Sequence, residues 1–236
     1  DKRPAFRLRK KLDWAYDRIR PLRRTDPAAQ AMLEQANPRA GRTAAYLRDF
    51  AAYPVYSGTN VKFYASGEAV FPDLLEALES AQESILLEFF IISKGKMWDA
   101  VHDVLRRKAA QGVDVRIYTP GIPDKKMVYQ LTCSYFEPLI RSGVKIYTFT
   151  PGFLHAKTWL VDGRTAVVGS INLDYRSLYL HFECAALLYG CAALADVGEF
   201  MMQLEKQSHL VELKECRTSA PGLMVSALLR LLAPLC

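Results

Sequence analysis

One stretch of this 236-residue chain, residues 155–172, constrains its fold and chemistry more than any other, and it reads HAKTWLVDGRTAVVGSIN. Its fixed positions follow the pattern H-x-K, then D after four residues, then G-S-x-N after six more. Six fixed residues at fixed spacing arise by chance at about 10⁻⁸ per starting point when residues are drawn evenly. We therefore treat the stretch as a functional motif.

The same stretch predicts two short strands joined by a tight turn. The run AKTWLV alternates and is rich in β-forming residues, it stops at Asp162-Gly163, and TAVVGS resumes as a second strand. Asp162, the D of the motif, has the wrong parity to stand beside His155 and falls at the turn. We therefore expect Asp162 to organise the turn and not to act as a general base.

Strand periodicity also predicts which motif side chains lie together. Side chains repeat every two residues on a strand, so His155 and Lys157 are expected on one face. Ser170 and Asn172 are likewise expected to share a face of the next strand. Gly169 has no side chain, which lets backbone or ligand approach closely at that point.

These side chains suit chemistry on a phosphodiester. An imidazole is a nucleophile or proton carrier near neutral pH, whereas ammonium, hydroxyl and amide groups donate to phosphate oxygens. The motif therefore predicts His155 as nucleophile, with Lys157, Ser170 and Asn172 holding the developing charge. No cluster of carboxylates or histidines has metal-ligand spacing, so neither a metal nor another cofactor is implied. The alternative is a structural histidine satisfied by a neighbour.

The motif resembles the HKD motif of the phospholipase D superfamily, and residues 120–158 and 171–183 resemble the C-terminal half of bacterial cardiolipin synthases. The resemblance implies a covalent phosphohistidine at His155, with a second histidine protonating the leaving alkoxide. It also implies that Glu183, on a later strand, orients His155. The implied substrate is phosphatidylglycerol, an anionic phospholipid of the membrane.

Two further charged positions lie near predicted strand ends. Lys125 follows a strand in the loop PGIPDKK, where it either contacts a phosphate or remains a solvated lysine. Glu88 interrupts the apolar run 84–92, and a charge in such a run is either paired or faces a site.

The net charge of +6 is concentrated at the N-terminus, because residues 1–24 contain ten Lys and Arg against three Asp. Such a basic arm binds anionic lipid or nucleic acid, or is simply a solvated helix or tail; the resemblance favours lipid. The five cysteines include no C-x-x-C pair, which indicates reduced thiols in a cytosolic compartment. We find neither a signal peptide nor an apolar run of about 18 residues that could span a membrane.

The resemblance suggests a location at the cytoplasmic face of the bacterial cytoplasmic membrane. Cardiolipin synthases usually carry N-terminal membrane helices followed by a basic segment, and residues 1–24 resemble that segment without the helices. The apolar helix predicted at 223–235 either docks on the domain or lies in a membrane surface.

Strands alternate with helices, which predicts the α/β class: a phospholipase D-like αβα sandwich with a mixed sheet and one HKD repeat. We expect a basic helical arm at 1–42, ending in a turn or linker at 37–42, a catalytic domain at 43–215, and a C-terminal apolar helix at 216–236. Besides the motif strands, the predicted strands are 61–64, 84–92, 113–119, 144–149 and 179–188. The predicted helices of the domain are 43–53, 71–81, 97–111, 127–142 and 192–207.

The chain has one motif where cardiolipin synthases carry two. Residues 43 to about 116 resemble the start of the first repeat, and the chain from about 112 onward resembles the end of the second, with a seam near QGVDVR. We therefore expect a homodimer with one shared site, in which a twofold axis brings two copies of His155 face to face. Three functions remain open: a cardiolipin synthase-type phosphatidyltransferase, a phosphodiesterase or nuclease using water, and an inactive half-enzyme. Nucleic acid is the less favoured substrate.

Overall fold

The computed structural model describes residues 26–51, 53–58, 60, 62–92, 95–122, 126–174, 177 and 182–216. Contacts divide the chain into two units, Asp1–Phe63 and Tyr64–Cys236. The basic segment 1–24, Lys125 and the predicted helix 223–235 lie outside the described residues. None of the described helices is long and apolar enough to cross a lipid bilayer.

The described part of the first unit forms the helices α2 (Pro27–Ala36) and α3 (Pro38–Ala51). The Asp26 carboxylate caps α2 by accepting from the Ala29 N–H at 2.9 Å. The prediction of a turn or linker at 37–42 is wrong, because α3 begins at Pro38. The Asn37 side chain accepts from the Ala40 N–H at 3.1 Å, and a proline suits the first turn of a helix.

The second unit is built on a seven-stranded sheet in the order β6-β5-β4-β1-β2-β3-β7. Its strands are β1 (Ser84–Glu88), β2 (Asp114–Pro120), β3 (Lys145–Phe149), β4 (Lys157–Val161), β5 (Thr165–Gly169), β6 (Ala185–Tyr189) and β7 (Ser208–Leu210). Its helices are α4 (Gly67–Ser80), α5 (Lys96–Ala110), α6 (Lys126–Cys133), α7 (Phe136–Arg141), α9 (Ala193–Lys206) and the 3-10 turn η2 (Leu213–Cys216). Strands β1, β2 and β3 are parallel, and the remaining pairs are antiparallel.

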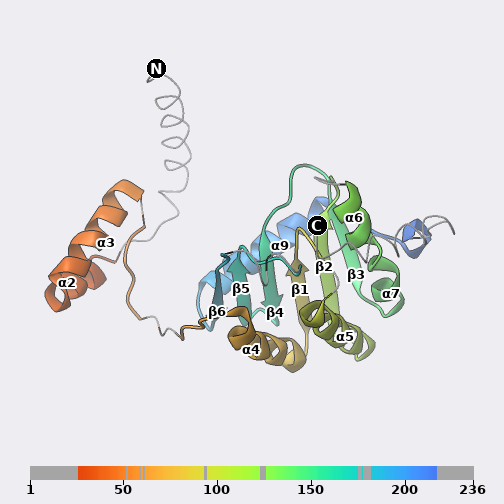
Figure 1. Cartoon of the computed structure of the whole chain (residues 1–236), viewed down its shortest axis with the longest axis horizontal. Coiled ribbons are helices and arrows are strands. Elements are labelled where there is room, and N and C mark those ends of the chain that lie inside the picture. The colour runs from red at the N-terminus through yellow and green to blue at the C-terminus, as the bar shows by residue number, and fades with distance from the viewer. Residues whose placement is uncertain are drawn as a thin grey trace, which may run out of the picture. The chain divides into compact units, whose positions relative to one another are not determined.

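Helices cover both faces of this sheet, with α4 and α5 in front of it and α9 behind it (Figure 1). One core lies on the α5 side and includes Trp98, Leu105 and Trp159; the other lies under α9 and includes Leu160 and Met201. The predicted αβα sandwich with a mixed sheet is therefore confirmed.

Some predicted boundaries are wrong for local reasons. The helix predicted at 127–142 is two helices, because Pro138 has no N–H to donate to the Ser134 carbonyl. The strand predicted at 84–92 ends at Glu88, since the Ile91 N–H turns away to the Asn172 side chain. Residues 62–64 form no strand.

The strand predicted at 179–188 and carrying Glu183 is displaced. Strand β6 begins at Ala185, so Glu183 lies two residues before it. The short strand β7 was not predicted, and it pairs with β3 by placing Leu210 opposite Tyr147.

Asp162 organises the turn between β4 and β5, as the sequence predicts. Asp162 and Gly163 have φ of 48° and 62°, the left-handed values that a type I′ hairpin turn needs. The Asp162 carboxylate accepts backbone N–H groups of Gln82, Glu83 and Ser84 at 2.8–2.9 Å. Burial would raise the pKa of this carboxyl, but these hydrogen bonds outweigh it and lower the pKa.

The antiparallel pairs β1–β4, β4–β5 and β5–β6 bring the ends of several strands to one edge of the sheet. The end of β1 pairs with the start of β4, with Glu88 opposite Thr158, and Lys157 lies opposite Gly169 at the end of β5. Gly169 in turn lies opposite Ala185 at the start of β6. The motif residues at the start of β4 and at the end of β5 therefore meet at this edge of the sheet, which we call the motif edge. Asp162, in the turn between these two strands, lies at the opposite edge.

We expect Asp162 to contribute strongly to stability. Asp162→Ala leaves three backbone N–H groups without their charged acceptor and should lower the free energy of unfolding by about 2–4 kcal/mol. Asp162→Asn keeps one acceptor oxygen and the tolerance for positive φ, so about half of that loss is expected. Urea unfolding measures both. The exposed control Asp196→Ala should change stability by less than about 0.5 kcal/mol; equal effects at the two positions would contradict this role.

Candidate active site

His155 lies at the motif edge, two residues before β4, and its side chain is exposed. Two phenylalanine rings pack on the imidazole and on each other, with their own centroids 5.2 Å apart. The ring centroid of Phe90 lies 4.7 Å away, and Phe153 stacks on the imidazole at 5.7 Å with planes 15° apart. These rings fix the position of the imidazole while leaving it open to solvent.

Lys157 is buried beneath this histidine, with 4% of its surface exposed. Its ammonium donates a hydrogen bond to the His155 carbonyl and lies 5.2 Å from the centroid of the Phe90 ring. Burial lowers the pKa of Lys157, although the carboxyls of Glu183, Glu88 and Asp174 act against that shift. The structure thus brings the two residues of H-x-K together around Phe90.

Asn172 completes this cluster from the segment after β5. Its side-chain oxygen accepts the Ile91 N–H at 3.2 Å, next to Phe90, and the residue is buried. The oxygen is thereby committed to the backbone, which leaves the amide N–H groups as its donors. Asn172 lies beyond the end of β5, so the predicted shared strand face with Ser170 is not formed.

Ser170 and Gly169 hold β5 against β6. The Ser170 hydroxyl donates to the Cys184 carbonyl at 3.3 Å and accepts the Cys184 N–H at 3.2 Å. A Cβ on Gly169 would lie 2.5 Å from the Ala185 Cβ and from the Cys184 carbonyl oxygen. Gly169 is therefore needed for the approach of one backbone to another.

Three carboxyl groups act on Lys157. Glu183 is half-buried just before β6, and its charge is the largest of the three influences that sustain the lysine pKa. Asp174 is buried and accepts the Ser177 N–H at 2.8 Å. Glu88 is fully buried at the end of β1.

Asp162, although a position of the motif, is not part of this cluster. Asp162 serves the opposite edge of the sheet and contacts the start of β1. Lys125 lies outside the described residues. Sequence reasoning missed Phe90 as a site residue; its only signal is an aromatic residue at the end of an apolar run that also contains Glu88.

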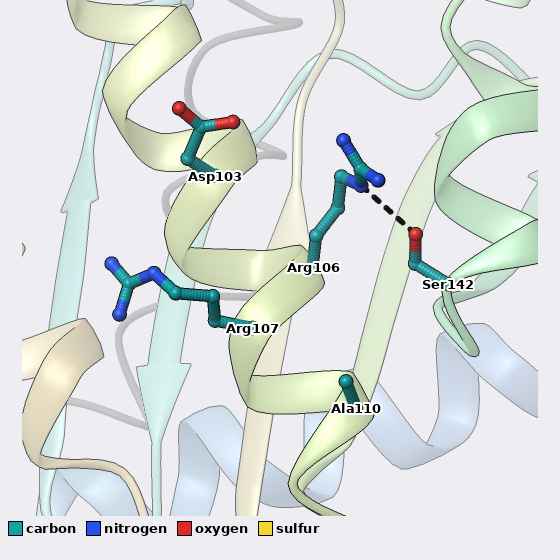
Figure 2. Close-up of a pocket in the computed structure, with 5 residues that line it drawn as sticks. All are labelled: Asp103, Arg106, Arg107, Ala110 and Ser142. Atoms are coloured by element: carbon teal, nitrogen blue, oxygen red, sulfur yellow. Dashed lines mark hydrogen bonds between the residues drawn. The ribbon is translucent and has the colours of Figure 1, made fainter.

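A separate polar groove opens between α5 and α7, away from the motif residues. Figure 2 shows its lining: Asp103, Arg106, Arg107, Ala110 and Ser142. Arg106 points across the groove and donates to the Ser142 hydroxyl at 2.9 Å. No motif residue lines this groove, so it is not where we look for the chemistry of the motif.

The motif edge can support nucleophilic attack on phosphorus. It presents an exposed imidazole, a buried ammonium below it and the amide of Asn172 beside it. A cation held in a poorly solvated position stabilises developing negative charge more strongly than one in water. Among the described residues, no group of three or more His, Cys, Asp or Glu could hold a metal ion.

Comparison with known proteins finds a family match over more than half of the chain. Residues 74–207 match the family model described as cardiolipin synthase, PLD-like domain. A Streptococcus mutans protein described as uncharacterized is 40% identical over 185 residues, which cover 76% of this chain and 38% of that protein. A cardiolipin synthase of Geobacillus sp. (strain WCH70) is 44% identical over 105 residues, covering 44% of this chain and 21% of the synthase. The chain thus spans well under half the length of these relatives.

Solved structures share the fold. A phospholipase D family member, Nuc from Salmonella typhimurium, aligns with a TM-score of 0.51 at 22% identity, over 62% of this chain and 94% of Nuc. The phosphatidylserine synthase of Haemophilus influenzae aligns with a TM-score of 0.57 at 17% identity, over 85% of this chain and 51% of that enzyme.

The packing at Gly169 gives a direct test of the junction that carries Ser170 and Glu183. Gly169→Ala should separate β5 from β6 and lower the free energy of unfolding by about 1–3 kcal/mol. Thermal or urea denaturation measures the loss. The matched control is Gly198→Ala in α9, whose new Cβ would meet Leu160 at an ordinary 3.6 Å. The control should be neutral or stabilising, since alanine favours helices; a neutral Gly169→Ala would contradict the close approach.

Proposed function

The chain belongs to the phospholipase D superfamily, with a PLD-like domain of the cardiolipin synthase type, and on that premise we propose that it is a phosphatidyltransferase. The proposed reaction joins two phosphatidylglycerols to give cardiolipin and glycerol. The observation that carries the proposal is the exposed His155, packed against Phe90 and Phe153 above the buried Lys157.

In the first half of the reaction, a ring nitrogen of His155 attacks the phosphorus of one phosphatidylglycerol. The bond from phosphorus to the glycerol headgroup oxygen breaks, and the oxygen leaves with a proton from a second imidazole. Lys157 and the Asn172 amide stabilise the charge on the non-bridging oxygens. Ser170 assists only if its hydroxyl leaves the Cys184 backbone.

In the second half, a headgroup hydroxyl of another phosphatidylglycerol attacks the phosphohistidine. The second imidazole takes the hydroxyl proton, the phosphorus–nitrogen bond breaks, and cardiolipin leaves. Glu183 supports Lys157 electrostatically and, by resemblance to the family, orients His155. Lys125 is a further proposed contact for the lipid phosphate.

Exposed apolar side chains on segments of the motif edge favour lipid over nucleic acid. Phe153 is 56% exposed, Ile122 follows β2 with 46% exposed, and Phe182, before β6, is fully exposed. All three belong to segments at the motif edge. Acyl chains and the glycerol backbone suit such an apolar surface, whereas a nucleic acid would need a basic one.

The second imidazole is proposed to come from a second copy of the chain. General acid catalysis contributes about 10²–10⁴ in rate, and the chain has one HKD motif. A twofold axis places identical residues opposite each other. The exposure of His155 leaves its ring accessible to the His155 of the partner.

We further propose that the enzyme works at the surface of the bacterial cytoplasmic membrane, on its cytoplasmic face. Phosphatidylglycerol is anionic, and the ten basic residues of 1–24 would be attracted to such a surface by about 1 kcal/mol each near the lipid.

The test is incubation of the full chain with phosphatidylglycerol vesicles, followed by mass spectrometry of the lipids. We expect cardiolipin from the wild type and at least a hundredfold less from His155→Ala, since both the nucleophile and the partner acid are lost. The matched control His209→Ala removes an exposed histidine of β7 and should keep activity. Excess His155→Ala chain mixed with wild type should reduce the rate if subunits exchange in a dimer.

Other products would contradict the transferase. Phosphatidic acid in place of cardiolipin would assign water as the acceptor and favour the phosphodiesterase. The phosphodiesterase is the second candidate function, and the observation that favours it is the single HKD motif of this chain. No lipid product from folded protein would favour an inactive half-enzyme.

A further inference from the structure

Glu88 is a buried carboxyl without a use in the proposed reaction. It ends β1, its exposed fraction is 0%, and neither carboxyl oxygen has a partner in good hydrogen-bond geometry among the described residues, although the Thr158 hydroxyl lies close enough to favour the charged form. Buried polar groups are almost always hydrogen-bonded, and an isolated buried charge is costly. A change in the charge of a neighbouring group therefore easily converts such a carboxyl between its charged and neutral forms.

The neighbours of Glu88 come from the two strands beside it. Thr158 lies opposite on β4, and Tyr118 lies opposite on β2. The Tyr118 hydroxyl donates to Glu205 at 2.7 Å, so its proton is committed elsewhere. Burial raises the pKa of Glu88 to about 7, while the Thr158 hydroxyl and the Lys157 ammonium act in the opposite direction.

Lys157 is the charged group through which Glu88 meets the active site. The carboxyls that act on its ammonium are Glu183, Glu88 and Asp174. Asp174 accepts hydrogen bonds from both the backbone and the hydroxyl of Ser177, and Glu183 is only half-buried. Glu88 is therefore the most deeply buried carboxyl of the three, and burial favours the neutral form of such a group.

We propose that Glu88 is a positioning residue that takes up one proton from water when a phosphate anion binds beside Lys157, and releases it when the anion leaves. The proton adds to a carboxylate oxygen, and no other bond changes. The proposal rests on the proposed function only in taking Lys157 as the anion contact.

The physical reason is charge balance in a buried site. Without substrate, ionised Glu88 offsets the Lys157 ammonium. A bound phosphate brings a second negative charge, which favours the neutral form of a nearby carboxyl. Protonation of Glu88 then leaves the ammonium free to interact with the phosphate. By linkage, anion binding and proton uptake strengthen each other.

The experiment is calorimetric titration of the full chain with sulfate, which keeps its charge near neutral pH. At pH 7.5, the same titration in two buffers of different ionisation enthalpy gives the protons taken up per anion. Imidazoles also exchange protons in this range, so His155→Ala is the reference protein. It should take up about half a proton per sulfate, given a Glu88 pKa that rises by roughly one unit.

The variant Glu88→Gln, made in the His155→Ala chain, should bind sulfate with its proton uptake reduced to near zero. The control Glu199→Gln, which changes an exposed carboxyl of α9 in the same background, should keep the uptake. Carboxyl carbon NMR of the protein without substitutions is a second readout: one buried carboxyl should titrate near pH 7 and move to higher pH with sulfate.

Unchanged proton uptake in the Glu88→Gln protein would overturn the proposal, as would the absence of any sulfate binding or of a carboxyl that titrates near neutral pH. Failure of the lipid assay is a separate result. A protein that binds sulfate with Glu88-linked uptake but makes no cardiolipin would keep this inference and lose the transferase.

Discussion

The hydrogen bonds of Asp162 are the constraint on which the active-site geometry depends. The carboxylate accepts three backbone N–H groups from 82–84, and the Asp162 N–H donates to the Ser84 carbonyl at 2.9 Å. These contacts fix β4 against β1, with Ile85 opposite Val161 and Glu88 opposite Thr158. A slip of one residue would turn every side chain of β4 to the other face. The D of the motif thus positions the H and the K from the far edge of the sheet.

The active site combines this rigid register with a group of charges that are poorly solvated. Lys157 is buried among three carboxyls, and one aromatic ring, Phe90, contacts both the lysine and the histidine. Such a site holds its ammonium and amide donors in place before the transition state, so little reorganisation is needed when negative charge develops on the phosphate. The cost is the full burial of the Glu88 carboxyl, a departure from ordinary core composition that is typical of functional sites.

Local patterns in the sequence were sufficient for the parts of the fold that local chemistry determines. The Asp162-Gly163 turn, α5 and α9 were predicted within a residue or two, because turn residues and apolar periodicity specify them. The partners of Asp162 lie about 80 residues away in the chain, and no local pattern reveals such a contact. The active site shows the same difference between features that the local sequence determines and features that depend on distant contacts.

His155 and Lys157 were predicted to lie together, and they do, because the motif places them two residues apart. The role of Gly169 and Ser170 at the β5–β6 junction depends on the neighbouring strand β6. The sequence predicted that this strand begins at residue 179, whereas it begins at Ala185. Phe90 was missed because its contact with His155 exists only once β1 and β4 pair.

The most direct test of the proposed chemistry is detection of the covalent intermediate. The enzyme is mixed with phosphatidylglycerol, quenched with acid and digested, and the peptides are analysed by mass spectrometry. We expect a phosphatidyl group on the peptide that contains His155. Product formation without that adduct, or an adduct on another residue, would contradict the role of His155 as the nucleophile.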